Sequence, residues 1–117
     1  MAYNQAFYPM GKTFLLSGNV TNKSVTVSAD SPCSQYLFIN HEKESSGQPV
    51  YVRISATAGQ NAAVANATSG NYGIPIRPAE SIVLSGPQCS SSANVYITYI
   101  TAAGTADVYV TPGEGMR

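Results

Sequence analysis

Charged side chains are scarce in this chain of 117 residues: Asp, Glu, Lys and Arg together make up 10% of it, against about 25% in ordinary globular proteins. The six basic and six acidic residues cancel to a formal net charge of zero. Binding to nucleic acid needs a basic excess that neutralises phosphates, so the composition argues against nucleic acid as the main ligand. Hydrophobic residues reach 44%, which permits a real core and excludes the composition of a disordered chain.

Histidine and cysteine are scarce as well, which leaves few side chains for metal binding. The chain has one histidine, two cysteines and no tryptophan. A structural zinc site usually takes four nitrogen or sulfur ligands, so three such side chains are too few. Residues 41–44 (HEKE) form the only cluster that could hold a metal or carry acid–base chemistry. Because consecutive residues of an extended segment point apart, we interpret this cluster as a solvated turn and expect no metal and no cofactor.

Nucleophilic catalysis has little support in the sequence. Serines are plentiful, but there is no G-x-S-x-G elbow and no G-x-G-x-x-G or Walker phosphate motif. His41 is the only imidazole that could serve as a base. Spacing leaves open a triad of a serine, His41 and either Asp30 or Asp107, since triads assemble in space rather than along the chain. The sequence nevertheless predicts that the protein is not an enzyme and has no catalytic residues.

The ends of the chain and its cysteines indicate a compartment. No run approaches the 18 or more apolar residues that span a bilayer, so we expect no membrane contact. Residues 1–11 (MAYNQAFYPMG) contain neither the basic start nor the apolar stretch of a secretory signal. This predicts either a protein that stays in the cytoplasm, where it is made, or one whose signal has been removed, and Met1 favours the first alternative. Cys33 and Cys89 each lie in a polar, proline-containing turn. Two free thiols are the expected state in a reducing compartment, although a bridge is geometrically possible if the adjoining strands start at the same end of a sandwich.

Strand-forming residues dominate the apolar part of the chain. Val and Ile total 17, whereas Leu occurs four times, and branching at Cβ favours strands over helices. Apolar and polar residues alternate with a period of two, typical of half-buried strands, in residues 24–29, 50–56 and 105–111. Five further strands are expected, at residues 12–17, 35–40, 73–77, 80–85 and 94–102.

Local signals place some of these strands. Residues 35–40 are apolar throughout their middle, which predicts a central strand covered on both faces. Pro75 and Pro78 put residues 73–77 at a sheet edge, because proline cannot donate to a ladder. Residues 102–105 (AAGT) join two strong strands and predict a hairpin. Residues 40–49 and 57–72 are irregular, and loops of that length often bind something.

These elements predict an all-β protein, specifically an antiparallel β-sandwich, jelly-roll-like, with about eight short strands in a single domain. The domain would span residues 12–117 and follow an N-terminal arm of residues 1–11. The pattern does not fix the strand order, so a jelly roll and an immunoglobulin-like sandwich remain alternatives.

Aromatic side chains are the candidate contact residues, since the chain has eight tyrosines. Tyr51, Tyr96 and Tyr109 are expected to point outward, near Arg53 and Thr98. Such a face resembles the core of a protein interface. Two alternatives remain: the face could be a platform for sugars, or the tyrosine rings could simply lean over the rim of the sandwich. The arm carries further aromatic residues, which are unfavourable in water unless they dock on their own domain or on a neighbour. The candidate partner-binding residues are Tyr3, Phe7, Tyr8, Tyr51, Arg53, Tyr96 and Tyr109.

One part of the chain resembles a known group of proteins. Residues 73–86 (GIPIRPAESIVLSG), followed by residues 95–99 (VYITY) and 106–113 (ADVYVTPG), resemble the second half of small β-sandwich virion proteins of tailed bacteriophages, of the capsid decoration (cement) or head-fibre type. In that group an I-P-I-x-P-x-E-x-I-x-L turn and strand leads into a final hairpin. Glu80 stands ahead of Ile82 and Leu84 in the same way. The resemblance covers roughly a third of the chain, and residues 1–48 resemble no family.

The resemblance implies a structural role. Proteins of this group bind the major capsid protein and stabilise the head lattice, often as homotrimers at local symmetry axes, through many weak contacts multiplied over the lattice. They assemble in the host cytoplasm and reside on the capsid surface of the virion. The alternative is a carbohydrate- or receptor-binding, lectin-like module of a head fibre or tail, with Tyr51, Tyr96, Tyr109 and the loop at residues 57–72 as its surface.

Overall fold

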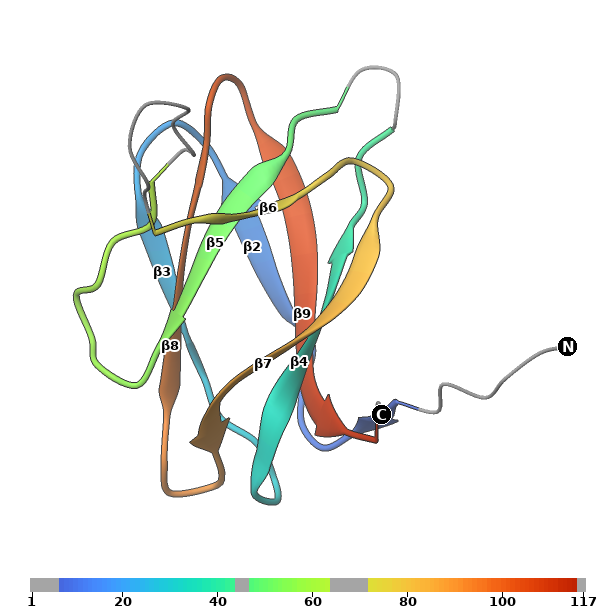
Figure 1. The fold of residues 1–117 in the computed structure, drawn as a ribbon, viewed down its shortest axis with the longest axis vertical. Helices are drawn as coiled ribbons and strands as arrows, with labels where there is room; N and C mark the ends of the chain where they lie inside the picture. Colours follow the sequence, from blue (N-terminus) through green and yellow to red (C-terminus); the bar gives the residue numbers. More distant parts are fainter. Residues whose placement is uncertain (1–6, 44–46, 64–71, 116–117) are drawn as a thin grey trace, which may run out of the picture.

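The computed structural model describes residues 7–43, 47–63 and 72–115 (Figure 1). Within these residues the chain forms nine β-strands, and it contains no helix long and apolar enough to cross a membrane. The strands are β1 (Tyr8–Pro9), β2 (Phe14–Gly18), β3 (Lys23–Val27), β4 (Cys33–Asn40), β5 (Val50–Ser55), β6 (Ile74–Ile76), β7 (Ser81–Cys89), β8 (Val95–Thr101) and β9 (Ala106–Glu114).

The strands pair into two antiparallel sheets that pack face to face (Figure 1). The five-stranded sheet has the order β2-β9-β4-β7, with the short β1 also paired to β9, and the four-stranded sheet has the order β3-β8-β5-β6. From β2 onward the chain crosses between the sheets at every connection except the one from β5 to β6. This is the strand order of a jelly roll, which decides between the two alternatives that the sequence left open.

The core lies between the two sheets and is built from alternate residues of each strand. In β9, Ala106, Val108 and Val110 are buried, as the alternation predicts, and β5 likewise buries Val50 and Val52. The largest buried side chains come from central and edge strands of both sheets. These fully buried residues include Tyr36, Phe38, Leu16, Ile76, Ile97, Val27 and Val95.

Each of the eight strands expected from the sequence is present, but β7 and β9 are longer than predicted. Gly86 and Pro87, typical turn residues, lie inside β7, and Pro112 and Gly113 lie inside β9. Pro87 is tolerated because β7 is an edge strand, where a missing N–H leaves no ladder bond unmade. The edge position predicted for residues 73–77 is confirmed, since β6 pairs only with β5.

The hairpin predicted at residues 102–105 is wrong. The turn itself is present, with Gly104 at φ 67° and the Thr101 hydroxyl donating to the Gly104 carbonyl at 2.8 Å. However, β8 and β9 belong to different sheets, so the turn carries the chain across the sandwich. Both strands bury one face toward the core, but each does so as part of a different sheet rather than by pairing with the other.

The prediction that residues 35–40 are covered on both faces is also wrong. β4 is central, between β9 and β7, and Tyr36, Phe38 and Asn40 point into the core. On the other face Ile39 is 40% exposed, since all nine strands of the described residues belong to the two sheets and none forms a third layer over the outside of the five-stranded sheet. The apolar residues of that face therefore form a surface.

Candidate interaction surfaces

A row of apolar side chains crosses the outer face of the five-stranded sheet; we call it the apolar row. Register places its members together: Leu15 lies opposite Tyr109, Tyr109 opposite Ile39, and Leu37 opposite Val83. Directly opposed residues share a face of the sheet, so the row spans β2, β9, β4 and β7. Leu15 and Ile39 are 49% and 40% exposed, and the other three are half-buried.

Tyr109 is among the candidate residues predicted from the sequence, whereas the four aliphatic members of the row are not. A signal was present, because residues 36–39 (YLFI) are apolar at both odd and even positions. Such a run predicts either two covered faces or one exposed apolar face. A strand buried on both faces and a strand with an interaction face have the same local pattern, so only the tertiary arrangement separates them.

The predicted HEKE cluster lies at one end of the apolar row and is structural where described. The His41 ring packs edge-on against Tyr109, with centroids 5.8 Å apart, and the His41 N–H donates to the Asp107 carbonyl at 3.1 Å. Glu42 Oε2 accepts a hydrogen bond from the Asp107 N–H at 3.0 Å. Glu44 lies outside the described residues. These contacts tie the start of the β4–β5 loop to β9, in agreement with the interpretation as a turn.

The triads left open by spacing are not assembled in the described parts of the chain. Asp30 precedes β4 and His41 follows it, so the eight residues of that strand separate them by roughly 25 Å. Asp107 meets His41 through backbone atoms. Residues 7–43, 47–63 and 72–115 contain no group of three His, Cys, Asp or Glu side chains that could hold a metal ion.

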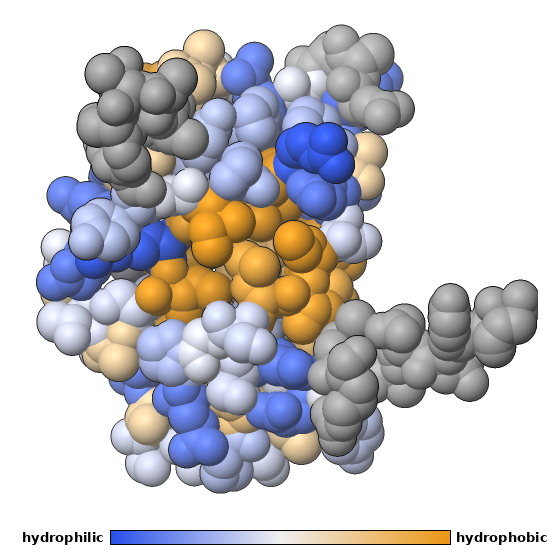
Figure 2. Space-filling model, viewed as in Figure 1, coloured by the Kyte–Doolittle hydropathy of each residue, from blue (hydrophilic) through white to orange (hydrophobic). Residues whose placement is uncertain are grey.

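A groove opens along one edge of the sandwich; we call it the edge groove. Figure 2 shows apolar side chains gathered at the centre of the view, over the opening between β5, β6 and β7. The groove has a volume of about 360 Å³. It exists because β6 pairs only with Val50–Val52, which leaves the second half of β5 without a neighbour on that side, and because the outer edge of β7 is unpaired. Its lining residues are Val52, Arg53, Ile54, Tyr72, Gly73, Ile74, Ser85 and Gly86.

Two contacts shape the edge groove. A side chain at Gly86 would bring its Cβ to 3.0 Å from Ile54 Cγ2, so glycine lets β7 approach β5. At the rim the Arg53 guanidinium carbon lies 4.0 Å from the centroid of the Tyr72 ring, a cation–π contact. Arg53 Nη1 also donates to the Asn61 carbonyl at 3.1 Å. Arg53 is therefore held by two described parts of the β5–β6 connection, one at Asn61 and one at Tyr72.

The outer face of the four-stranded sheet carries Tyr51 and Tyr96, both half-buried. Residues 60–62 lie over this face, since the Thr98 hydroxyl donates to the Gln60 carbonyl at 2.8 Å. Thr98 is consequently buried, although its alternation predicted an outward position. The prediction that Tyr109 lies with these residues is wrong, because β9 belongs to the other sheet. Alternation tells which residues face outward but not on which sheet.

The described part of the N-terminal arm docks on its own domain. Tyr8 and Pro9 pair with Glu114 and Gly113 of β9. The Phe7 ring covers Gly113, where an added Cβ would lie 2.5 Å from Phe7 Cζ. Tyr8 nevertheless remains 66% exposed. Tyr3 lies outside the described residues. Residues 7–9 of the arm thus dock on their own domain, one of the two possibilities that the sequence left open.

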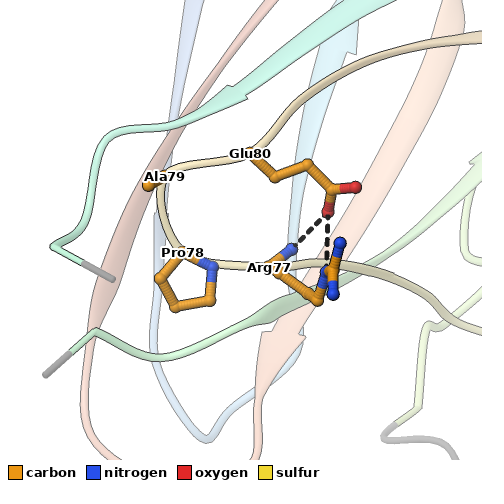
Figure 3. A pocket seen from close by; sticks show the side chains of 4 residues that line it. All are labelled: Arg77, Pro78, Ala79 and Glu80. Atoms are coloured by element: carbon orange, nitrogen blue, oxygen red, sulfur yellow. Dashed lines mark hydrogen bonds and ion pairs between the residues drawn. The ribbon is translucent and has the colours of Figure 1, made fainter. Parts of the chain in front are cut away.

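Residues 73–86, which contain the I-P-I-x-P-x-E-x-I-x-L pattern, form β6, a tight turn and the start of β7. Figure 3 shows this turn from close by. The Glu80 N–H donates to the Arg77 carbonyl at 3.1 Å, and Glu80 Oε1 accepts from the Arg77 N–H at 2.8 Å and lies 3.7 Å from Arg77 Nε. A surface pocket of about 560 Å³ lies against the turn. The glutamate of the motif thus holds the β6–β7 connection closed.

Comparison with known proteins adds no relative to this description. No family model matches the chain, and neither the curated proteins nor the solved structures contain a match to it. The inference of function therefore rests on the surfaces described above and on the resemblance carried by residues 73–113.

Proposed function

We propose that this chain is a non-enzymatic structural protein of a bacteriophage virion, a capsid decoration (cement) protein that binds the major capsid protein and stabilises the head lattice. The observation that carries the proposal is the apolar row. Contiguous apolar side chains on an uncovered sheet face are unfavourable in water and mark surfaces that dock on a partner. The resemblance of residues 73–113 to phage virion proteins supports a capsid as that partner.

The free energies of burial and docking favour binding by an oligomer over binding by a single copy of the chain. Covering the exposed half of a leucine or isoleucine stabilises a complex by about 1 kcal/mol. Leu15 and Ile39, which are 49% and 40% exposed, therefore contribute about 2 kcal/mol together, and each of the three half-buried members of the row contributes less. Docking of two proteins costs about 4–15 kcal/mol in lost freedom. One row alone therefore binds weakly. A homotrimer presents three rows to the lattice, and once the first is bound the others bind at high effective concentration. Such trimers would assemble in the host cytoplasm and reside on the capsid surface.

Cosedimentation with expanded empty capsids tests the proposal. The wild-type chain should pellet with capsids in a saturable way. Ile39→Thr and Leu15→Thr remove exposed apolar surface while leaving the core unchanged, and each should weaken binding at least tenfold. Val20→Thr is the matched control, because Val20 is at least as exposed as Leu15 and Ile39 but lies in the β2–β3 loop away from the row. No binding by the wild type, or equal binding by all four proteins, would contradict the proposal.

A carbohydrate- or receptor-binding module of a head fibre or tail is the second candidate, and the edge groove favours it. Its volume of about 360 Å³ is in the range that takes small ligands. Tyr72 is 70% exposed and lies beside Arg53. The tyrosine ring offers an aromatic face to a ligand, and the arginine offers hydrogen-bond donors. A glycan array distinguishes the two functions: specific signals that Arg53→Ala abolishes and Ile39→Thr leaves unchanged would favour the second candidate.

A further inference from the structure

The two cysteines, far apart in sequence, face each other across the five-stranded sheet. Cys33 begins β4, Cys89 ends β7, and they are direct partners in the register of the two strands. Their Sγ atoms are 3.8 Å apart, and both side chains are buried. The sequence placed both residues in turns before strands. That position is wrong for Cys89, and the correction brings the two thiols together.

The geometry suits a disulfide. Directly opposed residues of antiparallel strands have Cα atoms about 4.5–5.5 Å apart, within the span of about 4.4–6.8 Å that a disulfide bridges. From a separation of 3.8 Å, side-chain rotation brings the sulfur atoms to the bonded distance of about 2.05 Å, so the strands need not move. Two sulfurs alone cannot complete a structural zinc site, and the described residues contain no third ligand for one.

The surroundings of the pair disfavour the thiolate form of Cys33. Burial, together with the neighbouring Cys89, raises the pKa of Cys33 to about 12, so the thiolate that would start an exchange is rare at neutral pH. An oxidant can nevertheless reach the two thiols because of where they lie in the sheet. The pair lies at the start of β4 and the end of the edge strand β7, and strand ends open locally at low free energy.

We propose that Cys33 and Cys89 form a reversible intramolecular disulfide that fastens the edge strand β7 to β4 when the protein meets a disulfide oxidant such as oxidised glutathione. One cysteine thiolate attacks the oxidant, forms a mixed disulfide and releases one reduced glutathione. The second thiolate displaces the other, and the two cysteine protons end on the two glutathione thiols. Two protein thiols are oxidised and one glutathione disulfide is reduced. This inference does not depend on the proposed function.

The bond would join residues 56 apart in sequence and restrict the unfolded chain. Long closed loops give the larger stabilisations, so we expect the midpoint of thermal unfolding to rise on the order of 10 °C on oxidation. Because β7 borders both the apolar row and the edge groove, the bond would also hold that border in place.

The experiment compares the full chain reduced with dithiothreitol and oxidised with glutathione disulfide. After denaturation, thiol titration should find two reactive thiols in the first sample and none in the second. The intact mass should fall by two hydrogen atoms, with the chain still monomeric on non-reducing gels, and the unfolding midpoint should rise as stated. Cys33→Ala and Cys89→Ala are matched controls whose midpoints should be the same in both conditions.

Three outcomes would overturn the proposal. Two thiols that persist after prolonged oxidation would show that the pair does not close. A stable glutathione adduct on wild-type protein would show that the second thiol cannot reach the mixed disulfide. Disulfide-linked dimers in place of the internal bond would show that the cysteines pair between chains. The thiol count and the mass are read on the wild type, so none of these outcomes depends on the folding of a variant.

Discussion

The side-chain amide of Asn40 donates a hydrogen bond to the backbone carbonyl of Ile76 at 2.9 Å, which links the central strand β4 of one sheet to the edge strand β6 of the other. The same amide donates to the Gln48 carbonyl at 3.2 Å, and Asn40 Oδ1 accepts from the Glu42 N–H at 3.0 Å. Asn40 is 1% exposed. A buried polar side chain with its bonds satisfied thus fastens one end of the sandwich, where the β4–β5 and β6–β7 connections meet.

Replacing Asn40 with alanine should destabilise the fold by about 2–4 kcal/mol, because it removes three buried or half-buried hydrogen bonds, two of which join separate segments of the chain. Chemical denaturation of the reduced protein measures the loss. Asn19→Ala is the matched control: Asn19 Oδ1 accepts only from the exposed Thr21 N–H, so its loss should stay within about 0.5 kcal/mol. Equal losses for the two variants would deny Asn40 this role.

Gly86→Ala should destabilise the protein by about 1–3 kcal/mol through overpacking. The added Cβ would lie 3.0 Å from Ile54 Cγ2 and 3.3 Å from Tyr36 Cε2, and β7 would have to move away from β5. Removing the obstructing side chain tests the cause: in a double-mutant cycle, Ile54→Ala should offset part of the loss from Gly86→Ala. Additive losses would indicate that the alanine acts elsewhere. Ser85→Ala, at an exposed neighbouring position, should be close to neutral.

The sequence predicted the strands and their inward faces because alternation is a local property. Val108 and Val110 are buried and Asp107 is not, as their spacing indicates. The same locality explains the errors. Turn chemistry at residues 102–105 is alike for a hairpin and for a crossing between sheets, and the distance between Tyr51 and Tyr109 depends on strand order. Local pattern contains no information on which strands become neighbours.

The candidate surfaces were predicted less well than the fold. The aromatic candidates follow from residue type alone, whereas the exposure of the apolar row depends on the tertiary fold, in which the strands of the described residues form two layers and no third. The role of Asn40 had no local signal at all, since an asparagine at the end of a strand is typical of a turn. Its partners Gln48 and Ile76 come from two other segments. Buried polar links of this kind depend on the tertiary fold.

Ala79→Gly should stabilise the protein by about 0.5–1 kcal/mol. Ala79 has a φ of 62° and is the only non-glycine residue with positive φ in the described parts of the chain. It follows Pro78 in a turn closed by the hydrogen bond from the Glu80 N–H to the Arg77 carbonyl, the arrangement of a type II turn, which favours glycine at the third position. Relief of the left-handed strain, about 1–2 kcal/mol, exceeds the added entropy of the unfolded chain, about 0.4–1 kcal/mol.

The control for that substitution is Ala102→Gly, at an exposed loop position whose φ is not positive. At position 102 glycine only adds conformational entropy to the unfolded chain, so the free energy of unfolding of this variant should fall by about 0.4–1 kcal/mol. Thermal and denaturant unfolding of the two variants should thus shift in opposite directions. A loss for both would mean that the β6–β7 turn relaxes without strain.

Alkaline pH should destabilise the reduced protein. Burial raises the pKa of Cys33 from 9.0 to about 12 and raises the pKa values of Tyr36 and Tyr99 above their ordinary value of 10.0. Above pH 9 the unfolded chain therefore loses protons that the folded chain keeps. The unfolded state then binds fewer protons, so the free energy of unfolding decreases as pH rises. The contribution of Cys33 is complete below pH 9 and is lost between pH 9 and about 12.

Unfolding midpoints measured from pH 8 to pH 11 should accordingly fall, and the variant Cys33→Ala should fall less steeply than the wild type. The oxidised protein provides an independent comparison, because a disulfide has no thiol to titrate and its curve should follow the shallower slope of the variant. If all three proteins had the same slope, Cys33 would already be ionised as easily in the folded chain as in the unfolded one. Its burial between β4 and β7 would then not control its protonation.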